Sequence, residues 1–167
     1  DVRVGVLLSS GIDSSIIASK ALRHRPDTML FTLGFDDPDF DESKIVRERF
    51  DKFSSQLKIV ELKFNLEDLL KVIIDLDTPL GDTSTIPLYT ITQEAQKYVK
   101  TCLTGDGADE ILGGYSTYHA TVLTTVLQQN KLGKWILEIS KLLAKNVPVK
   151  FGNVSLSYKL INFSKWN

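Results

Sequence analysis

The sequence predicts an α/β fold: a parallel sheet of about four or five strands with helices on both faces, followed by an all-helical extension. Strand-like and helix-like segments alternate through the first half of the chain, which is typical of a parallel sheet covered by helices. After Tyr115 the pattern is helical only. We therefore divide the chain into a sheet-bearing core over residues 1–118 and a helical extension over residues 119–167.

The first three elements follow from short apolar runs and their breaks. Residues 2–8 are mostly Val and Leu with Arg3 as the one charge, which indicates a buried strand. Residues 16–23 have a helical pattern that ends before Pro26, because proline does not continue a helix. Residues 28–35 return to an apolar run and predict the second strand.

The next elements alternate in the same way. Residues 41–56 begin with acids and carry apolar side chains at helical spacing, so they predict a helix. Residues 57–64 alternate apolar and charged side chains, as a strand with one solvated face does. Asn65 can cap a third helix, which ends before Pro79 and Gly81.

A fourth helix is predicted over residues 87–98, and a fourth strand over residues 100–104. Two apolar stripes then predict helices in the extension: Trp135, Ile139, Leu142 and Leu143, and Leu156, Leu160, Ile161 and Phe163. These helices either pack on the core or begin a helical subdomain, and the sequence leaves both alternatives open. Since the chain begins at Asp1 and its one methionine is Met29, we expect it to be cut from a longer protein.

Composition and charge exclude several classes of protein. The 167 residues contain 20 Lys and Arg against 21 Asp and Glu, a net charge of −1, which argues against nucleic-acid or anionic-lipid partners. The single cysteine, Cys102, excludes an internal disulfide, and with two histidines it excludes the usual zinc sites. We interpret Cys102 as a core residue. Without a membrane-length apolar run or a signal peptide, we expect a soluble, cytoplasmic domain.

Polar, glycine-containing segments follow three of the predicted strands, after Leu8, Leu33 and Leu103. Ligands of parallel sheets bind outside the carboxyl ends of the strands, near the point where the strand order reverses. We therefore expect these three segments to meet in space and to form a ligand site.

The first of them, residues 9–15, is called here the serine segment and has the sequence Ser-Ser-Gly-Ile-Asp-Ser-Ser. Short hydroxyl side chains and a glycine allow backbone N–H groups to converge on an anion, and the following helix adds its positive end. A phosphate therefore fits, although the segment is neither a Walker A loop nor a dinucleotide fingerprint. The alternative is an ordinary helix cap formed by Asp13 or Ser14.

Residues 103–115, called here the acidic segment, have the sequence Leu-Thr-Gly-Asp-Gly-Ala-Asp-Glu-Ile-Leu-Gly-Gly-Tyr. Glycines allow close approach of the backbone to a ligand, and three carboxylates (Asp106, Asp109 and Glu110) follow the end of a strand. Acids beside a phosphate loop need a cation between them, and Mg²⁺ prefers carboxylate and phosphate oxygens. The alternative is an acid-rich helix start that complements the helix dipole.

Together these segments resemble a known family. The serine segment resembles the S-G-G-x-D-S loop of the N-type ATP pyrophosphatases, and the acidic segment resembles the G-[ED]-G-x-D-E-hydrophobic-x-G-G-Y signature of the asparagine synthetase synthetase domain. Residues 31–35 and 79–87 are similar to two weaker segments of that family. The resemblance covers residues 2–118 and implies an adenine nucleotide alpha-hydrolase-like fold with a nucleotide-binding core.

The resemblance implies a two-step reaction with ATP and Mg²⁺. A carboxylate, aspartate in the first instance, would attack the α-phosphate of ATP to give an acyl-adenylate and pyrophosphate. Ammonia would then displace AMP and form the amide, asparagine. The small-molecule partners are thus ATP, the carboxylate acceptor and ammonia, and a glutaminase domain or subunit is the implied ammonia source, besides free ammonia.

The resemblance also assigns roles to individual residues. The implied ATP- and pyrophosphate-binding set is Leu7, Ser9, Ser10, Gly11, Asp13, Ser14, Leu33, Thr104 and Gly105. Asp13 and Asp109 would hold Mg²⁺ through their carboxylates. Asp106 lies where the family has Glu or Asp near the reacting carboxylate, so Asp106 and Asp109 are the catalytic candidates.

Other residues and departures from the family pattern leave alternatives open. Ser10 replaces the first glycine of the family loop, and neither a glutaminase half nor the family's C-terminal helical region can be recognised. A relative with a different acceptor, as in β-lactam or sugar amidation, is one alternative. A non-catalytic module is another, with Trp135, Ile139, Phe163 and Trp166 forming an exposed patch.

Two further groups of polar residues receive only weak assignments. The acidic run over residues 36–42 is interpreted as a solvated loop and helix start, with a substrate-gating role as the alternative. Asp82 and Ser84 are further candidates for substrate contact.

Overall fold

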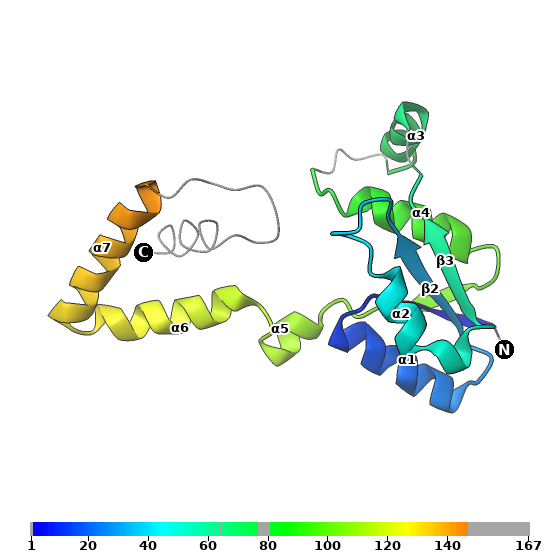
Figure 1. The fold of residues 1–167 in the computed structure, drawn as a ribbon, viewed down its shortest axis with the longest axis horizontal. Coiled ribbons are helices and arrows are strands. Elements are labelled where there is room, and N and C mark those ends of the chain that lie inside the picture. The colour runs from blue at the N-terminus through cyan, green and yellow to red at the C-terminus, as the bar shows by residue number, and fades with distance from the viewer. Residues whose placement is uncertain (1, 64, 77–80, 147–167) are drawn as a thin grey trace. The chain divides into compact units, whose positions relative to one another are not determined.

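The computed structural model describes residues 2–63, 65–76 and 81–146 (Figure 1). The chain divides into two compact units, Asp1–Asp106 and Gly107–Asn167. Each unit is described by itself below. The first contains a parallel sheet flanked by helices, which confirms the predicted α/β class.

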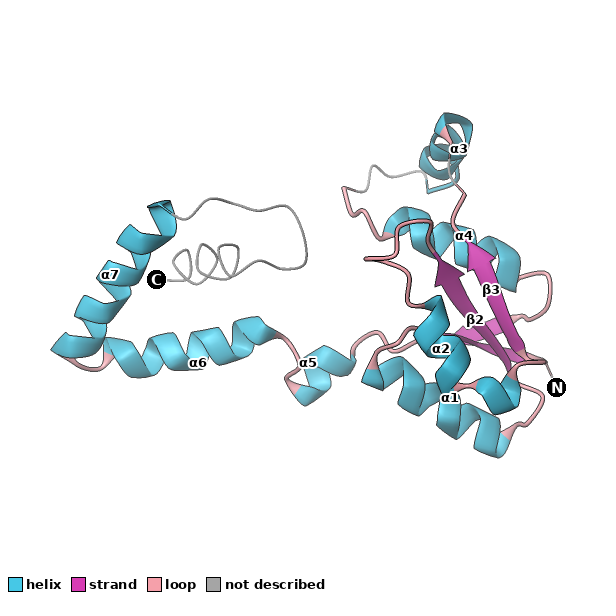
Figure 2. Ribbon diagram, viewed as in Figure 1, coloured by secondary structure: helices cyan, strands magenta, loops and turns pink. Residues whose placement is uncertain are grey.

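The sheet of the first unit has four strands, all parallel (Figure 2). They are β1 (Val4–Leu7), β2 (Met29–Gly34), β3 (Leu57–Glu61) and β4 (Thr101–Leu103). The order across the sheet is β3-β2-β1-β4, so successive strands are added on one side of β1 and then, with β4, on the other. This reversal makes the carboxyl ends of β1 and β4 the expected binding edge.

Helices cover both faces of this sheet (Figures 1 and 2). Helices α1 (Ile12–His24) and α2 (Ser43–Arg49), with a short 3₁₀ turn at Asp51–Phe53, cover one face, and α4 (Thr85–Ala95) covers the other. Helix α3 (Leu66–Leu76) packs against α4. Helix α1 begins earlier than the predicted start at residue 16, so part of the serine segment is helical. The predicted helix over residues 41–56 is shorter and ends in the 3₁₀ turn.

Two apolar clusters hold these layers together. On one face, side chains of β1 and β2 pack with α1 and α2: Val6, Leu8, Ala18, Leu22, Leu30, Val46 and Phe50. On the other face, Phe31 packs with Ile91, Ala95 and Val99 of the α4 region. Leu30 and Phe31 are consecutive and both fully buried, because neighbouring strand residues point to opposite faces.

Gly5 of β1 lies directly beneath the Phe31 ring, and no larger residue fits there without movement. A Cβ at Gly5 would lie 2.8 Å from Cε2 of Phe31, 3.0 Å from a methyl of Val99 and 3.1 Å from Sγ of Cys102. We expect Gly5→Ala to lower the free energy of unfolding by about 1–3 kcal/mol through overpacking. Urea denaturation measures this change, and Gly81→Ala, whose added Cβ meets nothing within 4 Å, is the control. A Gly5→Ala protein as stable as wild type would contradict the prediction.

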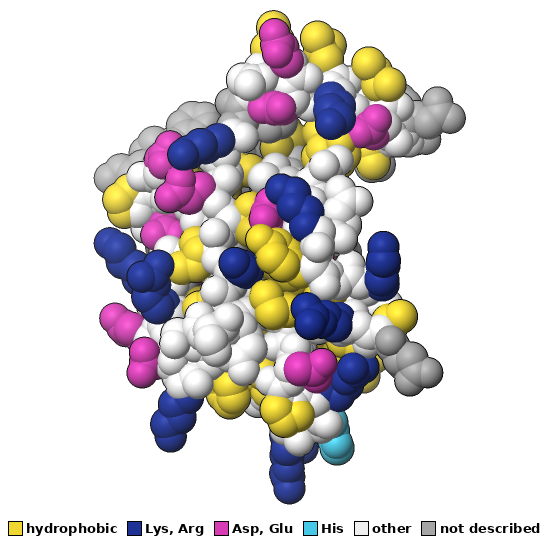
Figure 3. All heavy atoms as spheres, turned by 90° about the vertical axis from the view of Figure 1, so that its right-hand side faces the viewer, with side chains coloured by type: hydrophobic (Ala, Val, Ile, Leu, Met, Phe, Trp, Pro, Cys, Tyr) yellow, Lys and Arg dark blue, Asp and Glu magenta, His cyan; other side chains and the backbone are white. Residues whose placement is uncertain are grey.

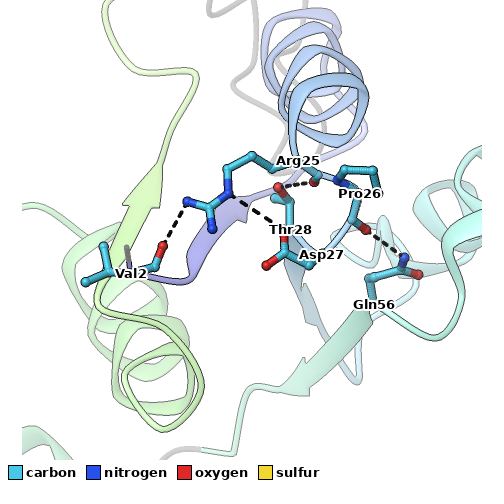
Figure 4. A network of polar contacts seen from close by, with 6 residues as sticks. All are labelled: Val2, Arg25, Pro26, Asp27, Thr28 and Gln56. Atoms are coloured by element: carbon cyan, nitrogen blue, oxygen red, sulfur yellow. Dashed lines mark hydrogen bonds and ion pairs between the residues drawn. The ribbon is translucent and has the colours of Figure 1, made fainter.

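Polar contacts join the amino ends of β1, β2 and β3 (Figure 4). Arg25 Nη1 donates to the Val2 carbonyl at 2.9 Å, and the buried Thr28 hydroxyl donates to the Arg25 carbonyl at 2.7 Å. Gln56 Nε2 donates to the Pro26 carbonyl at 3.1 Å. These bonds tie down the end of the sheet opposite the carboxyl edge, where we expected the ligand site.

Cys102 lies in β4, partly buried against the cluster around Phe31. Burial raises the pKa of its thiol, which disfavours the thiolate that a nucleophile would need. Its surroundings agree with the interpretation of Cys102 as a core residue.

The second unit is helical, as expected for the region after Tyr115. It contains α5 (Ala108–Leu112), α6 (Ser116–Gln128) and α7 (Lys131–Asn146), and α6 packs against α7. On α7 the side chains of Trp135 and Leu142 are 64% and 67% exposed, whereas that of Leu137 is buried. The exposed Trp135 fits the predicted patch, but Phe163, Trp166 and the second predicted stripe lie outside the described residues.

The surface agrees with the near-neutral composition. On the face drawn in Figure 3, basic and acidic side chains lie scattered among hydrophobic and neutral ones. Among the helices of the described residues, none has the length and apolar character needed to cross a membrane.

Candidate functional site

A pocket of about 480 Å³ opens at the carboxyl ends of β1, β2 and β4. The segments that follow Leu8, Leu33 and Leu103 all contribute to it, which confirms that the three polar segments meet. Nine predicted site residues line it: Leu7, Ser9, Gly11, Asp13, Ser14, Leu33, Thr104, Gly105 and Asp106. Ser84 also lines the pocket, and Ser10 lies in the same loop. Asp109 belongs to the second unit, so its pairing with Asp13 stays a prediction.

The serine segment is folded around the hydroxyl of Ser14, which is buried. Ser14 Oγ accepts the N–H of Ser9 at 3.1 Å and lies 2.8 Å from Ser9 Oγ. It also lies within hydrogen-bond distance of the Ser9 carbonyl, at 3.1 Å, and Ser9 Oγ accepts the N–H of Gly11 at 3.2 Å. Three residues of the segment therefore fix one another before any ligand is present.

The helix-cap alternative for Asp13 and Ser14 is wrong. The N-cap of α1 is Gly11, which makes no side-chain cap hydrogen bond, and Asp13 lies within the first turn. The first N–H groups of a helix have no intrahelical partner and carry the positive end of the helix dipole. Because Gly11, Asp13 and Ser14 all line the pocket, α1 begins at its wall and favours an anion there.

The acidic segment approaches the same helix start through Gly105. A Cβ at Gly105 would lie 3.1 Å from the backbone nitrogen of Ser14 and 3.4 Å from Cβ of Asp13. The backbone after β4 therefore passes α1 so closely that a side chain at Gly105 would have to push the start of α1 away. This close packing places Gly105 and Asp106 beside the serine segment.

The charged residues that line the pocket are all acidic. They are Asp13, Glu42 and Asp106, and among the described residues no Lys or Arg lines it. A polyphosphate could bind beside these carboxylates only together with a cation. No group of three or more acidic, His or Cys side chains in the described part of the chain could hold a metal ion by itself, so phosphate oxygens would have to complete the coordination.

Part of the pocket wall is apolar. Leu33, Phe35, Phe40, Leu88 and Ile91 contribute to it, from β2 and its following loop and from α4. Such a wall suits a flat heterocyclic ring, and the polar serine segment suits the charged end of the same molecule.

Two residues of the α2 region that contact the serine segment were not singled out as site residues in the sequence. Glu42 Oε2 accepts the N–H of Ser10 at 2.8 Å, and Arg49 Nη1 donates to the Ser10 carbonyl at 2.6 Å. Glu42 is exposed and is the N-cap of α2, which agrees with the predicted solvated helix start, and its carboxylate also bonds to the backbone of the serine segment. No spacing or motif in the sequence distinguishes Glu42 from the other acids of the run.

Asp41 and Asp82 have local roles beside the site. The Ser43 hydroxyl and N–H both donate to Asp41 and hold the pKa of its carboxyl below the usual value. The Ser84 N–H donates to Asp82 at 2.8 Å and lowers the pKa of that carboxyl in the same way. These bonds shape the two loops that contribute Glu42 and Ser84 to the pocket.

In the second unit, the glycines of the acidic segment each have a structural reason. Gly107 and Gly113 flank α5 with φ of 86° and 70°, left-handed values that favour glycine. A Cβ at Gly114 would coincide with the Asp109 carboxylate, 1.9 Å from Oδ1. The glycine pattern thus allows the turn after α5 and leaves room for the Asp109 side chain.

The last residue of this segment bonds back to its middle. The Tyr115 hydroxyl donates to Glu110 Oε1 at 2.7 Å, and this bond is the main cause that raises the pKa of Tyr115 to about 12. The same bond lowers the pKa of Glu110. The neutral phenol is favoured because its anion would lose the bond and face the carboxylate.

We expect Glu110→Gln to lower the pKa of Tyr115 toward its usual value of 10.0. Absorbance of phenolate, followed as pH is raised, should then show one more ionised tyrosine near pH ~11 than in wild type. Tyr115→Phe is the control, because it removes the late-titrating group altogether. Identical titration of Glu110→Gln and wild type would show that this bond does not form in solution.

Comparison of the sequence with known proteins matches the chain to one family. The family model described as asparagine synthase matches residues 1–161. Asparagine synthetase [glutamine-hydrolyzing] 1 of Bacillus subtilis (strain 168) is 38% identical over 120 residues, which cover 71% of this chain and 19% of the relative. A putative asparagine synthetase [glutamine-hydrolyzing] of Mycobacterium tuberculosis (strain ATCC 25618 / H37Rv) is also 38% identical over 120 residues, 71% of this chain and 18% of the relative.

A plant asparagine synthetase is also similar to this chain over part of its length. Asparagine synthetase [glutamine-hydrolyzing] 1 of Arabidopsis thaliana is 33% identical over 137 residues, which cover 71% of this chain and 23% of the relative. The chain thus spans about a fifth of the length of the curated relatives that it matches. From the family match over residues 1–161, the chain belongs to the asparagine synthase family.

Proposed function

We propose that this chain binds ATP and activates a carboxylate, aspartate in the first instance, as an acyl-adenylate that ammonia converts to asparagine. The proposal rests on one observation: residues of the serine segment, Gly105 and Asp106 line the same pocket. Membership of the asparagine synthase family supports it. Because the chain spans about a fifth of its relatives' length, the complete reaction is proposed for the full-length gene product.

The pocket suggests how ATP would be held. The β- and γ-phosphates would lie against the serine segment, Ser9, Ser10, Gly11, Asp13 and Ser14, at the positive end of α1. Main-chain groups of Leu7, Leu33, Thr104 and Gly105 would face the rest of the nucleotide, with the adenine against the apolar wall. This orientation directs the α-phosphate toward Asp106.

The donor set of the pocket fits Mg²⁺. Within the described part of the chain the three carboxylates of the pocket have no basic neighbour on its wall, so a polyphosphate would need a cation to bind there. We propose Asp13 as one ligand, and the family resemblance implies Asp109 as the other. When bound, Mg²⁺ would neutralise the charge of the phosphates and of the departing pyrophosphate.

The chemistry requires two displacements. A carboxylate oxygen of the acceptor forms a bond to the α-phosphorus while the bond to the pyrophosphate oxygen breaks. The nitrogen of ammonia then attacks the acyl carbon, AMP leaves with the electron pair of the acyl–oxygen bond, and a proton is lost from nitrogen. We place Asp106 beside the reacting carboxylate, and the chain contributes mainly by holding the reactants and opposing their charge.

A glutaminase domain or subunit is the proposed source of ammonia. The names of the relatives describe glutamine-hydrolysing enzymes, which supports this proposal for the protein to which the chain belongs. Free ammonia would bypass that requirement in an assay.

Exchange of labelled pyrophosphate into ATP tests the activation step. We expect the full-length gene product to exchange label only when Mg²⁺ and aspartate are present, without any need for glutamine. A panel of carboxylic acids in the same assay separates aspartate from other acceptors. A protein that is folded but binds no Mg²⁺-ATP in calorimetry would favour the non-catalytic module, for which the exposed Trp135 is the supporting observation.

A further inference from the structure

The backbone N–H and carbonyl of Ser10 both bond to the α2 region. Glu42 Oε2 accepts its N–H at 2.8 Å, and Arg49 Nη1 donates to its carbonyl at 2.6 Å. We propose that Glu42 and Arg49 are positioning residues that hold the serine segment in its phosphate-binding conformation; this inference rests on the proposed function. They act through Ser10 rather than by contact with the reacting atoms.

Ser10 differs from its neighbours in where its backbone partners come from. The N–H groups of Ser9 and Gly11 bond inside the segment, to the hydroxyls of Ser14 and Ser9. The N–H and carbonyl of Ser10 instead bond to residues that lie 32 and 39 positions away in sequence. The two peptide groups beside Ser10 therefore depend on the α2 region for one hydrogen bond each, in addition to the bonds that the Ser9 carbonyl and the Gly11 N–H make inside the segment.

The α2 region is a rigid support for these contacts. Val46 and Phe50 bury it against the sheet with exposures of 1% and 4%, in the same apolar cluster as Ala18 and Leu22 of α1. Arg49 also donates to Ser15 Oγ at 2.9 Å, so the guanidinium joins the loop to the first turn of α1. Movement of the Ser10 backbone would have to break contacts to a helix region that Val46 and Phe50 anchor in the core.

Both contacts are made by charged side chains. The N–H of Ser10 belongs to the peptide group before its Cα and the carbonyl to the peptide group after it, so the carboxylate and the guanidinium each hold one of two consecutive peptide groups through a charge-assisted hydrogen bond. A different role for Glu42 would be an internal anion that competes with phosphate for the Ser10 N–H. That role requires no partner at the carbonyl, whereas Arg49 provides one. The two roles also predict opposite changes in the affinity for Mg²⁺-ATP when Glu42 is replaced: weaker binding if Glu42 positions the segment, and tighter binding if it competes with phosphate.

The test compares Glu42→Ala with Glu42→Gln, which keeps an acceptor for the Ser10 N–H but removes the charge. We expect Glu42→Ala to raise the Kd for Mg²⁺-ATP about 5- to 10-fold, the effect of one exposed charge-assisted hydrogen bond, and Glu42→Gln to restore most of the affinity. The rate of pyrophosphate exchange at saturating ATP should change less than the KM for ATP. Glu48→Ala, an exposed acid of the same helix outside the pocket lining of the described residues, is the matched control.

Arg49 provides a second, independent pair of variants. We expect Arg49→Ala to weaken Mg²⁺-ATP binding to a similar extent and Arg49→Lys to weaken it less. Arg47→Ala removes the same charge from the same helix and serves as its control.

Amide hydrogen exchange of Ser10, measured without nucleotide, tests the hydrogen bond between the Ser10 N–H and Glu42 directly. Exchange at this amide should become about 10-fold faster in Glu42→Ala than in wild type, and should stay slow in Glu42→Gln. If wild type binds Mg²⁺-ATP and both Glu42 variants bind it equally well, the inference is wrong. Tighter binding by both variants would also overturn it and assign Glu42 the role of a competing anion. Failure of wild type to bind Mg²⁺-ATP would overturn the proposed function, and the inference with it, whatever the Ser10 amide does.

Discussion

Replacing Asp13 with asparagine is expected to lower kcat/KM for pyrophosphate exchange by at least about 100-fold. Asp13 lies in the first turn of α1 and lines the pocket beside the serine segment. Asparagine has nearly the same shape, so the substitution removes a negative charge and one metal-binding oxygen while leaving the packing in place. The expected loss comes from weaker Mg²⁺ binding, and therefore from weaker binding of the phosphates that Mg²⁺ accompanies.

The dependence on Mg²⁺ concentration identifies this cause. In Asp13→Asn the concentration of Mg²⁺ for half-maximal exchange should rise, and high Mg²⁺ should recover part of the activity. Asp51→Asn is the matched control, since Asp51 is an exposed acid of the 3₁₀ turn outside the pocket lining of the described residues. If Asp13→Asn retained wild-type exchange with an unchanged Mg²⁺ requirement, Asp13 would not be a metal ligand.

The fold could be predicted because its signals are local. Apolar runs and helical spacing are properties of five to fifteen consecutive residues, and their alternation specifies a parallel sheet with helices on both faces. The start of α1 was predicted too late for a local reason as well. Asp13 and Ser14 are favoured capping residues, and nothing in the sequence shows that the chain begins its helix at Gly11 without a side-chain cap.

The meeting of the polar segments was predictable from topology, since the carboxyl ends of parallel strands share one edge. The contacts of Glu42 and Arg49 with Ser10 were not. Each joins residues more than thirty positions apart, and an exposed acid at a helix start is usually solvated. Only the packing of α2 against the sheet brings these side chains to the loop, and no single segment of the sequence contains that information.

Gly105 provides the strongest test of the close approach between the backbone after β4 and the start of α1, because a glycine there leaves space between the two. A Cβ there would lie 3.1 Å from the backbone nitrogen of Ser14, an atom that cannot move without moving the start of α1. We expect Gly105→Val to reduce Mg²⁺-ATP affinity by about 10- to 100-fold, the loss expected when one charge-assisted hydrogen bond from the start of α1 to a phosphate is broken. Gly105→Ala should have a smaller effect of the same sign.

The control separates this local effect from general destabilisation. Gly81→Val adds the same side chain where an added Cβ meets nothing within 4 Å, and it should leave ATP affinity and thermal unfolding unchanged. Gly105→Val should unfold cooperatively with a stability loss of about 1–3 kcal/mol, too small to unfold a typical domain at 25 °C. A folded Gly105→Val protein that bound Mg²⁺-ATP with wild-type affinity would show that the phosphates do not lie where β4 passes the start of α1. In that case the shared pocket would no longer support the proposed function.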